Sequence, residues 1–92
     1  MPSKEPPGPG SITSLKVLEN QRALLAYEAN RATSFVLRHK KPGETTFYVC
    51  AQGLITPSWT SQALAAGPHE FEVLGHNSLG DGESSAPIRI TI

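Results

Sequence analysis

The chain has 92 residues, which is enough for one small domain with a modest core and too few for two. Eight basic and eight acidic residues cancel, so no net charge attracts nucleic acid or an anionic membrane surface. A single cysteine excludes an internal disulfide and a multi-thiolate metal site, and no apolar run is long enough to insert into a bilayer.

The N-terminal segment Met1–Gly10 contains four of the eight prolines and shows no apolar periodicity. Such a segment cannot bury enough surface to offset the entropy lost on ordering. We therefore predict a flexible linker or arm over residues 1–10 and one folded domain over residues 11–92. The arm also lacks the apolar run of a signal peptide.

Short runs of alternating apolar and polar residues, separated by turn residues, fill the rest of the chain and predict β-strands. An Ala/Leu-rich stretch at 20–32 could also form a helix, but it lacks a sustained helical period, so we predict a strand there. Residues 41–44 form a predicted turn, and residues 51–57 a predicted loop. The predicted strands are 12–18, 22–28, 34–40, 45–50, 58–64, 70–76 and 88–92. About seven short strands of this kind predict an all-β fold, a two-sheet antiparallel Greek-key sandwich.

The last third of the chain carries a more specific pattern. The stretch Pro68–Asn77 ends a strand in Asn, and Ser78–Pro87 follows with a Gly-x-Gly loop and a Ser and Pro before the last strand. This arrangement resembles the fibronectin type III family and, more loosely, other immunoglobulin-like sandwiches. The resemblance places Tyr27 where the family has a buried Trp, and His69 where it has a Tyr at a strand corner.

The resemblance and the alternation together predict a set of structural residues. Phe71 and Val73 share one face of their strand, and Leu64 is the inward residue just before the corner. The predicted structural residues are Tyr27, Leu64, His69, Phe71 and Val73.

Catalytic patterns are weak in this sequence. Asp81, the only Asp, follows His76 across a turn, and we interpret it as a turn-forming residue rather than as part of a Ser-His-Asp triad. Glu70 and Glu72 lie about 7 Å apart on one strand face, as in a glycosidase pair, but on a face that we expect to be solvated. We predict that the protein is not an enzyme.

Metal and cofactor sites are not predicted either. The three histidines, His39, His69 and His76, fall in different segments, and no sequence signal brings them together. Cys50 ends an apolar strand without a neighbouring cation, which favours a small buried side chain. No phosphate-binding loop or nucleophile-elbow motif occurs.

The only tryptophan allows two interpretations. If alternation continues from Leu64, Trp59 points to solvent and forms, with Tyr48, a flat platform for a sugar or a protein. If a bulge resets the alternation, Trp59 turns inward and fills volume lost at Tyr27.

We predict a non-catalytic module, acting as a structural spacer or as a protein-interaction or adhesion unit of a larger extracellular, cell-surface, enzyme-associated or virion protein. Its partners would be a protein or the neighbouring domains, and we expect a monomer without nucleic-acid binding. The alternatives are a carbohydrate-binding module that contacts polysaccharide, and an assembly protein whose 88–92 edge pairs with a partner strand. The free thiol is also compatible with an intracellular location. The predicted contact residues are Trp59, Tyr48, Asn77, Leu79, Asp81 and Glu83.

Overall fold

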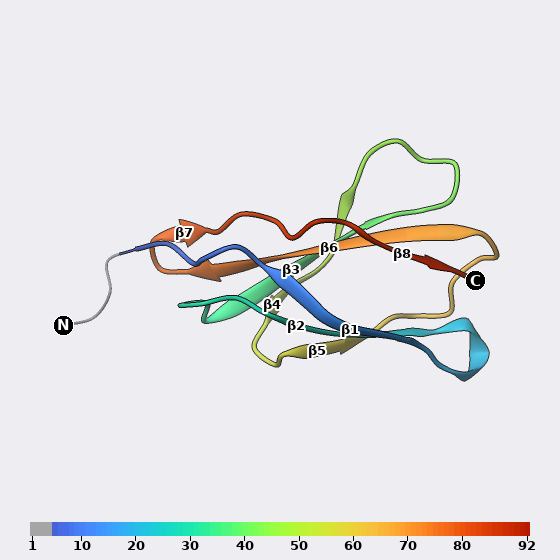
Figure 1. Ribbon diagram of the computed structural model, residues 1–92, viewed down its shortest axis with the longest axis horizontal. Helices are drawn as coiled ribbons and strands as arrows, with labels where there is room; N and C mark the ends of the chain where they lie inside the picture. The colour runs from blue at the N-terminus through green and yellow to red at the C-terminus, as the bar shows by residue number, and fades with distance from the viewer. Residues whose placement is uncertain (1–4) are drawn as a thin grey trace.

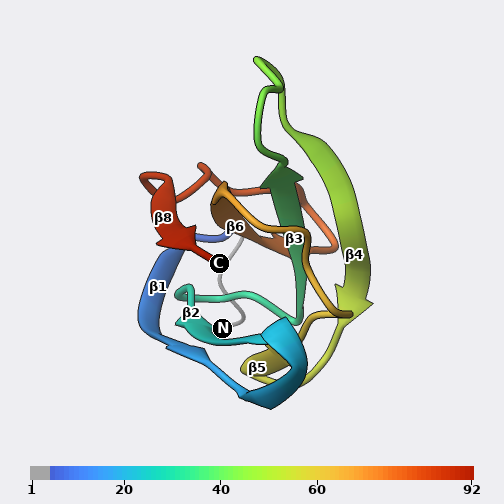
Figure 2. The same ribbon diagram turned by 90° about the vertical axis from the view of Figure 1, so that its right-hand side faces the viewer.

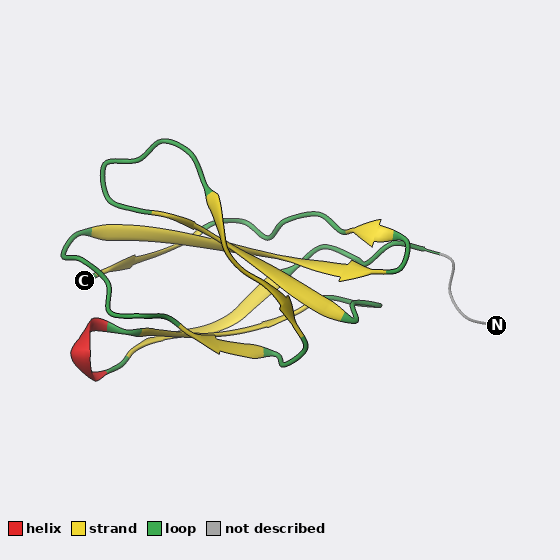
Figure 3. Cartoon of the chain, turned by 180° about the vertical axis from the view of Figure 1, so that it is seen from behind, coloured by secondary structure: helices red, strands yellow, loops and turns green. Residues whose placement is uncertain are grey.

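The computed structural model describes residues 5–92, which form two antiparallel β-sheets that enclose one core (Figure 1). One helical element occurs among these residues, the 3-10 turn η1 (Glu19–Gln21) that closes the first hairpin (Figure 3). None of the described helices is long and apolar enough to cross a membrane. The strands are β1 (Ser11–Val17), β2 (Ala23–Glu28), β3 (Ser34–Lys40), β4 (Tyr48–Leu54), β5 (Ser58–Thr60), β6 (Pro68–Asn77), β7 (Gly80–Asp81) and β8 (Ile88–Thr91).

Each of the two sheets is open and therefore has two edges. One sheet has the order β1-β2-β5, and the other has the order β4-β3-β6, with β7 and β8 both pairing with β6. β4 and β5 are therefore edge strands, one from each sheet, and they lie on the same side of the sandwich (Figure 2). The predicted two-sheet antiparallel sandwich is confirmed.

Alternation along the central strands fills the space between the sheets. Side chains from β2 and from the β3–β6 pair point inward from opposite sheets, because successive residues of a strand face opposite sides. Trp59, Leu64 and other half-buried apolar side chains pack around this centre. The fully buried apolar core consists of Ala23, Leu25, Tyr27, Leu37, Phe71, Val73 and Ile90.

The position of β4 differs from the sequence prediction. Alternation predicts a strand at 45–50 and a loop at 51–57, whereas β4 covers Tyr48–Leu54. The ladder between β3 and β4 contains two register shifts, so two neighbouring residues of β4 can oppose one residue of β3. These shifts break the period-two pattern by which a strand is recognised in a sequence.

β5 is also shorter than the predicted strand at 58–64, because it ends at Thr60. The reason lies in Ser61, whose backbone N–H donates to Ala23 O while its hydroxyl accepts from the Ala23 N–H at 2.8 Å. A side chain thus replaces the backbone carbonyl in the ladder, and the chain leaves strand geometry at this residue.

Residues 5–10 lie against the sandwich, although the composition predicts a flexible arm there. Pro7 is buried, the Gly8 N–H donates to Asn30 O, and the Gly10 N–H donates to Glu83 O, each at 3.0 Å. The composition rule fails here because backbone hydrogen bonds, rather than apolar side chains, hold the segment. The rest of the predicted arm, residues 1–4, lies outside the described residues, and the domain boundary at residue 10 stays a prediction.

Tyr27 occupies the core with its hydroxyl unpaired. The side chain is 2% exposed, and its ring packs edge-on against Phe35 with 4.8 Å between centroids. Within residues 5–92 no partner accepts or donates a hydrogen bond at its hydroxyl. Burial also raises the pKa of Tyr27 to about 12, since the phenolate would be desolvated.

Replacing Tyr27 with Phe should increase the free energy of unfolding by about 1 kcal/mol, because an unpaired buried hydroxyl is removed while the ring stays. Urea unfolding of the variant measures this change. Tyr48→Phe is the matched control, because the Tyr48 hydroxyl has a partner and its removal should lower stability. A loss of stability in Tyr27→Phe would contradict the prediction.

Candidate functional site

A hollow lies between the edge strands β4 and β5, and we call it the β4–β5 groove. Its volume is about 950 Å³, within the range of about 300–1,000 Å³ that small-ligand sites occupy. The end of β3, the start of β6 and the segment 61–66 complete its walls. The lining residues are His39, Lys41, Pro42, Tyr48, Val49, Cys50, Trp59, Thr60, Ser61, Gln62, Ala63, Leu64, Ala65, Ala66 and His69.

Trp59 forms part of the groove wall and also packs on the core. It lies opposite Leu25, which is fully buried, so both side chains share the inner face of their sheet. Its ring is half-buried and meets Phe71 edge-on, with 6.1 Å between ring centroids. Of the two interpretations of Trp59, the structure supports the inward one. Alternation counted back from Leu64 does not apply, because the strand ends at Thr60.

Tyr48 and two histidines form a chain of hydrogen bonds below the groove. The Tyr48 hydroxyl lies 2.7 Å from His39 Nδ1, and His39 Nε2 lies 2.9 Å from His69 Nδ1. His69 Nε2 in turn lies 2.7 Å from Ala65 O. His69 thus makes a hydrogen bond to the backbone of the segment that precedes β6. The chain therefore joins an exposed phenol to a backbone carbonyl through two buried imidazoles.

The final carbonyl fixes the direction of every hydrogen bond in this chain. Ala65 O can only accept, so His69 carries its proton on Nε2 and accepts at Nδ1. His39 must then donate from Nε2 and accept at Nδ1, which leaves the Tyr48 hydroxyl as the donor. With both imidazoles neutral, all three side chains have their hydrogen bonds satisfied.

Burial and neighbouring charge disfavour a proton on His39. The residue is 4% exposed, and its ring stacks on Phe71 at 4.4 Å with 4° between the planes. Desolvation is the main cause that lowers the pKa of His39 to about 4; repulsion by His69, when it is protonated, and by Lys41 acts in the same direction, and Glu44 opposes it. His39 is therefore neutral in the folded state near neutral pH.

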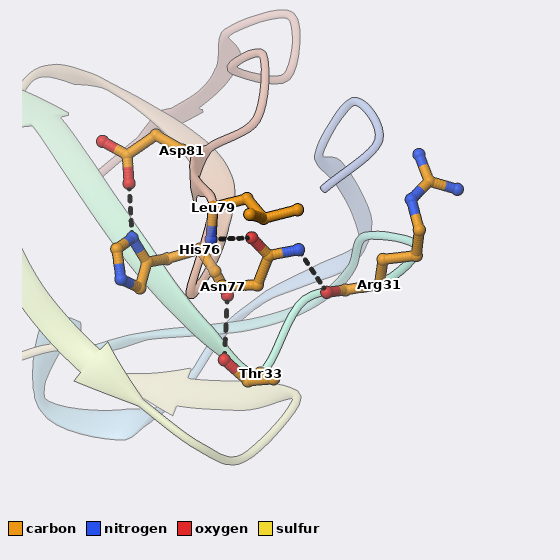
Figure 4. A network of polar contacts seen from close by, with 6 residues as sticks. All are labelled: Arg31, Thr33, His76, Asn77, Leu79 and Asp81. Carbon is orange, nitrogen blue, oxygen red and sulfur yellow. Dashed lines mark hydrogen bonds and ion pairs between the residues drawn. The ribbon is translucent and has the colours of Figure 1, made fainter. Parts of the chain in front are cut away.

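The other predicted contact residues lie around the loop that follows β6 (Figure 4). Asn77 organises this loop: its Oδ1 accepts from the Leu79 N–H at 2.8 Å, and its Nδ2 donates to Arg31 O at 3.1 Å and to Glu5 O at 3.2 Å. Leu79 is 51% exposed, and Asp81 and Glu83 are exposed as well. Asn77 is a structural residue here, whereas the other three are accessible to a partner.

The two groups of predicted contact residues do not form one surface. Trp59 and Tyr48 lie beside His39 and Phe71, near the start of β6, whereas Asn77 ends the same strand. The six residue steps from Phe71 to Asn77 span about 20 Å of extended chain. The structure therefore separates the groove from the loop after β6.

A Ser-His-Asp row does occur on the outer face of the second sheet. Ser34 lies opposite His76 across β3 and β6, and His76 Nδ1 lies 2.7 Å from Asp81 Oδ1. Both side chains of the His76–Asp81 pair are about half-exposed, and no hydrogen bond is described between Ser34 and His76. Solvent around the pair screens its charges, so the row lacks the enclosed, oriented base that acyl transfer requires.

The carboxylates Glu70 and Glu72 are both engaged in ion pairs on the outer face. Glu72 pairs with Arg38 directly across the β3–β6 ladder, and Glu70 Oε2 lies 2.6 Å from Lys40 Nζ. The hydrogen bond from Lys40 lowers the pKa of the Glu70 carboxyl. Both carboxylates thus face basic side chains, whereas a general acid for glycoside hydrolysis faces the scissile bond of a bound sugar.

Metal-binding and thiol chemistry find no support in the described region. Within residues 5–92 no group of three or more potential metal ligands converges. Cys50 is half-buried, and desolvation raises the pKa of its thiol to about 11, so the thiolate is scarce at neutral pH.

Comparison with known proteins relies on structure, because no protein-family model and no curated protein sequence matches the chain. It is similar to the fibronectin type-III domain of human fibronectin type III domain containing protein 3, with TM-score 0.67, 17% identity, and coverage of 99% of this chain and 89% of that one. A Fn3-like protein from Clostridium thermocellum gives TM-score 0.73 and 16% identity over 92% of this chain and 88% of that chain.

The chain has the fibronectin type III fold.

The twitchin kinase region from C. elegans (Fn31-NL-kin-CRD-Ig26) also contains this fibronectin type III fold, with TM-score 0.73 and 20% identity over 99% of this chain. This chain covers only 17% of the twitchin structure. A domain of this fold is thus found as a module of a longer chain.

Acidification should destabilise the domain through His39. Between its unfolded pKa of about 6.5 and its folded value of about 4, only the unfolded state binds the proton, so stability is present above this window and is lost as the pH falls through it. The loss should be at most about 3 kcal/mol, measured by urea unfolding across the window. His39→Phe should flatten the dependence, and an unchanged pH profile in that variant would argue against His39 as its source.

Glu72→Gln should lower the free energy of unfolding by about 1–2 kcal/mol, because it leaves the partly buried Arg38 without its carboxylate. Glu70→Gln is the matched control on the same strand face, and a smaller loss is expected because the Glu70 side chain is 21% exposed, against 10% for Glu72. Equal losses in the two variants, measured by thermal or urea unfolding, would refute this ranking.

Proposed function

We propose that this protein is a non-catalytic module that acts as a structural spacer or protein-interaction unit of a larger protein. The observation that carries the proposal is that the chain enters at one end of β6 and leaves at the other. Glu5 O accepts from Asn77 at the end of β6, and Ile92 exchanges two hydrogen bonds of 3.0 Å with Gly67, just before β6. β6 has ten residues and spans about 30 Å, so neighbouring domains would attach at opposite ends (Figure 1).

The entry end is held more firmly than a simple linker would be. Asn77 and Arg31 donate to the carbonyls of Glu5 and Pro6, in addition to the backbone hydrogen bonds of Gly8 and Gly10. Such contacts limit the orientations available to whatever precedes residue 5.

Two glycines, Gly75 and Gly82, make room for this entry segment because they carry no Cβ atom. A Cβ atom on Gly82 would lie 2.6 Å from Pro7 O and 2.7 Å from Gly8 O, and one on Gly75 would lie 3.1 Å from Pro7 Cβ. Only glycine allows residues 7 and 8 to approach the chain at Gly82 so closely. These glycines therefore support a role for the segment in orienting the module.

Leu79, Asp81 and Glu83 lie at the same end of the molecule as Glu5 and are exposed. We assign them to contact with the preceding domain or with a protein partner, where an exposed leucine beside charged residues suits a small mixed interface. A location outside the cell, at its surface or in a virion, and a monomeric state, stay predictions from the sequence.

The experiment places a donor and an acceptor fluorescent protein at the two ends of the chain and measures single-molecule energy transfer. A spacer should give one narrow distribution at low transfer, consistent with a long axis of 48 Å. Gly82→Ala should broaden the distribution, because its Cβ displaces residues 7 and 8.

Gly8→Ala is the matched control, since its Cβ would make only ordinary contact with Asn30 Cβ at 3.5 Å. The same distribution in the parent protein and in both variants would show that the segment does not orient the module. High transfer in the parent protein would refute the spacer itself.

A further inference from the structure

The hydrogen-bond chain beneath the β4–β5 groove determines what the groove can recognise. With both imidazoles neutral, the Tyr48 hydroxyl donates its hydrogen bond to His39 Nδ1. Only the lone pairs of the Tyr48 oxygen are then left for a ligand. Tyr48 lines the groove and is 39% exposed. A ligand that binds to this oxygen must therefore donate a hydrogen bond from an N–H or O–H group. A carboxylate, or a carbonyl without such a group, is a poor match.

The charge beside Tyr48 limits the kind of donor. Lys41 lines the groove, and its Nζ lies 5.3 Å from the centroid of the Tyr48 ring. This ammonium group repels a cationic donor such as a ligand amine. A neutral hydroxyl or amide N–H remains.

The remaining wall offers flat apolar contact. Trp59 contributes an aromatic ring to this wall, and Ala63, Ala65 and Ala66 contribute small apolar side chains. Thr60 and Gln62 add polar side chains at the groove. A ligand with one apolar face and several neutral donors at its rim matches this lining.

We propose that the β4–β5 groove binds a neutral carbohydrate, with a sugar hydroxyl donating to the Tyr48 oxygen and a C–H face of the ring packing on Trp59. This site goes beyond the spacer function, which depends on the two ends of β6. A pyranose ring combines neutral hydroxyl donors with an apolar C–H face, which neither an amine nor a carboxylate does. A peptide amide also donates a hydrogen bond, and its binding in place of a sugar would be a separate outcome of the test.

Trp59 is the only tryptophan of the chain, so its fluorescence reports on the groove without a label. The unmodified protein is titrated at neutral pH with cellohexaose, chitohexaose and maltohexaose, and with a neutral hexapeptide. We expect a saturable change in emission with at least one sugar, together with protection of Trp59 from quenching by acrylamide. Absence of saturation with all three sugars at millimolar concentration, or saturation by the peptide alone, would overturn the proposal.

Tyr48→Phe keeps the ring and removes only the oxygen, so it should weaken sugar binding by about tenfold or more. Leu79→Ala, at the other end of β6, is the matched control and should leave the affinity unchanged. Equal affinity in the parent protein and a folded Tyr48→Phe variant would overturn the assignment of the hydroxyl.

A measurement on the parent protein covers the case in which Tyr48→Phe does not fold. Nitrogen-15 spectra of the imidazoles should show the proton on Nε2 of both His39 and His69, and sugar should shift the ring signals of His39 and Tyr48 but not the methyl signals of Leu79. A proton on Nδ1 of His69, or no shift at Tyr48, would refute the proposed polarity of the groove. The energy-transfer experiment does not involve the groove, so failure of the spacer and failure of the sugar site are distinguishable.

Discussion

The unbroken pairing of β3 with β6 is the constraint on which the rest of the molecule depends. Seven consecutive residues of β3 pair with seven of β6, from Ser34 opposite His76 to Lys40 opposite Glu70, without a register shift. Because side chains alternate, this one register sends Leu37 and Val73 into the core and the charged residues to the outer face. A slip by one residue would exchange the two sets and bury the ion pairs, so the hydrophobic pattern and the charges specify the same register.

The same register brings two imidazoles into the interior. His39 lies opposite Phe71, and the next inward residue of β6 is His69, so the three rings stack in one layer. A buried imidazole is costly unless both nitrogens are paired, and here each nitrogen has a partner because the chain begins at Tyr48 and ends at Ala65 O. The polar layer at this end of the core is therefore complete, in contrast to the unpaired Tyr27 hydroxyl further along it.

The sequence was informative where pairing is regular and uninformative where side chains or register shifts intervene. The sequence of β2 and β3 alternates clearly, and their inward residues Leu25 and Leu37 are buried, as are Phe71 and Val73 of β6. β4 was misplaced because its ladder contains two shifts. Alternation left the orientation of Trp59 open, because Ser61 ends β5 before the pattern reaches Leu64. No sequence signal could place His39 against His69, thirty residues later, because their contact depends on the β3–β6 register.

The position of the groove relative to the two ends of the molecule connects the two proposed roles. The chain enters beside Asn77, whereas the groove opens between β4 and β5 near the exit end, where its lining residues Ala66 and His69 lie next to Gly67, the partner of Ile92. A domain attached at the entry end would leave the groove free, and a domain that follows Ile92 would lie close to it. Rigid attachment also favours recognition, because a groove held in a fixed orientation loses less rotational freedom when it meets an extended, immobile surface. A spacer with a lateral ligand site is therefore physically consistent, since neither role uses the residues of the other.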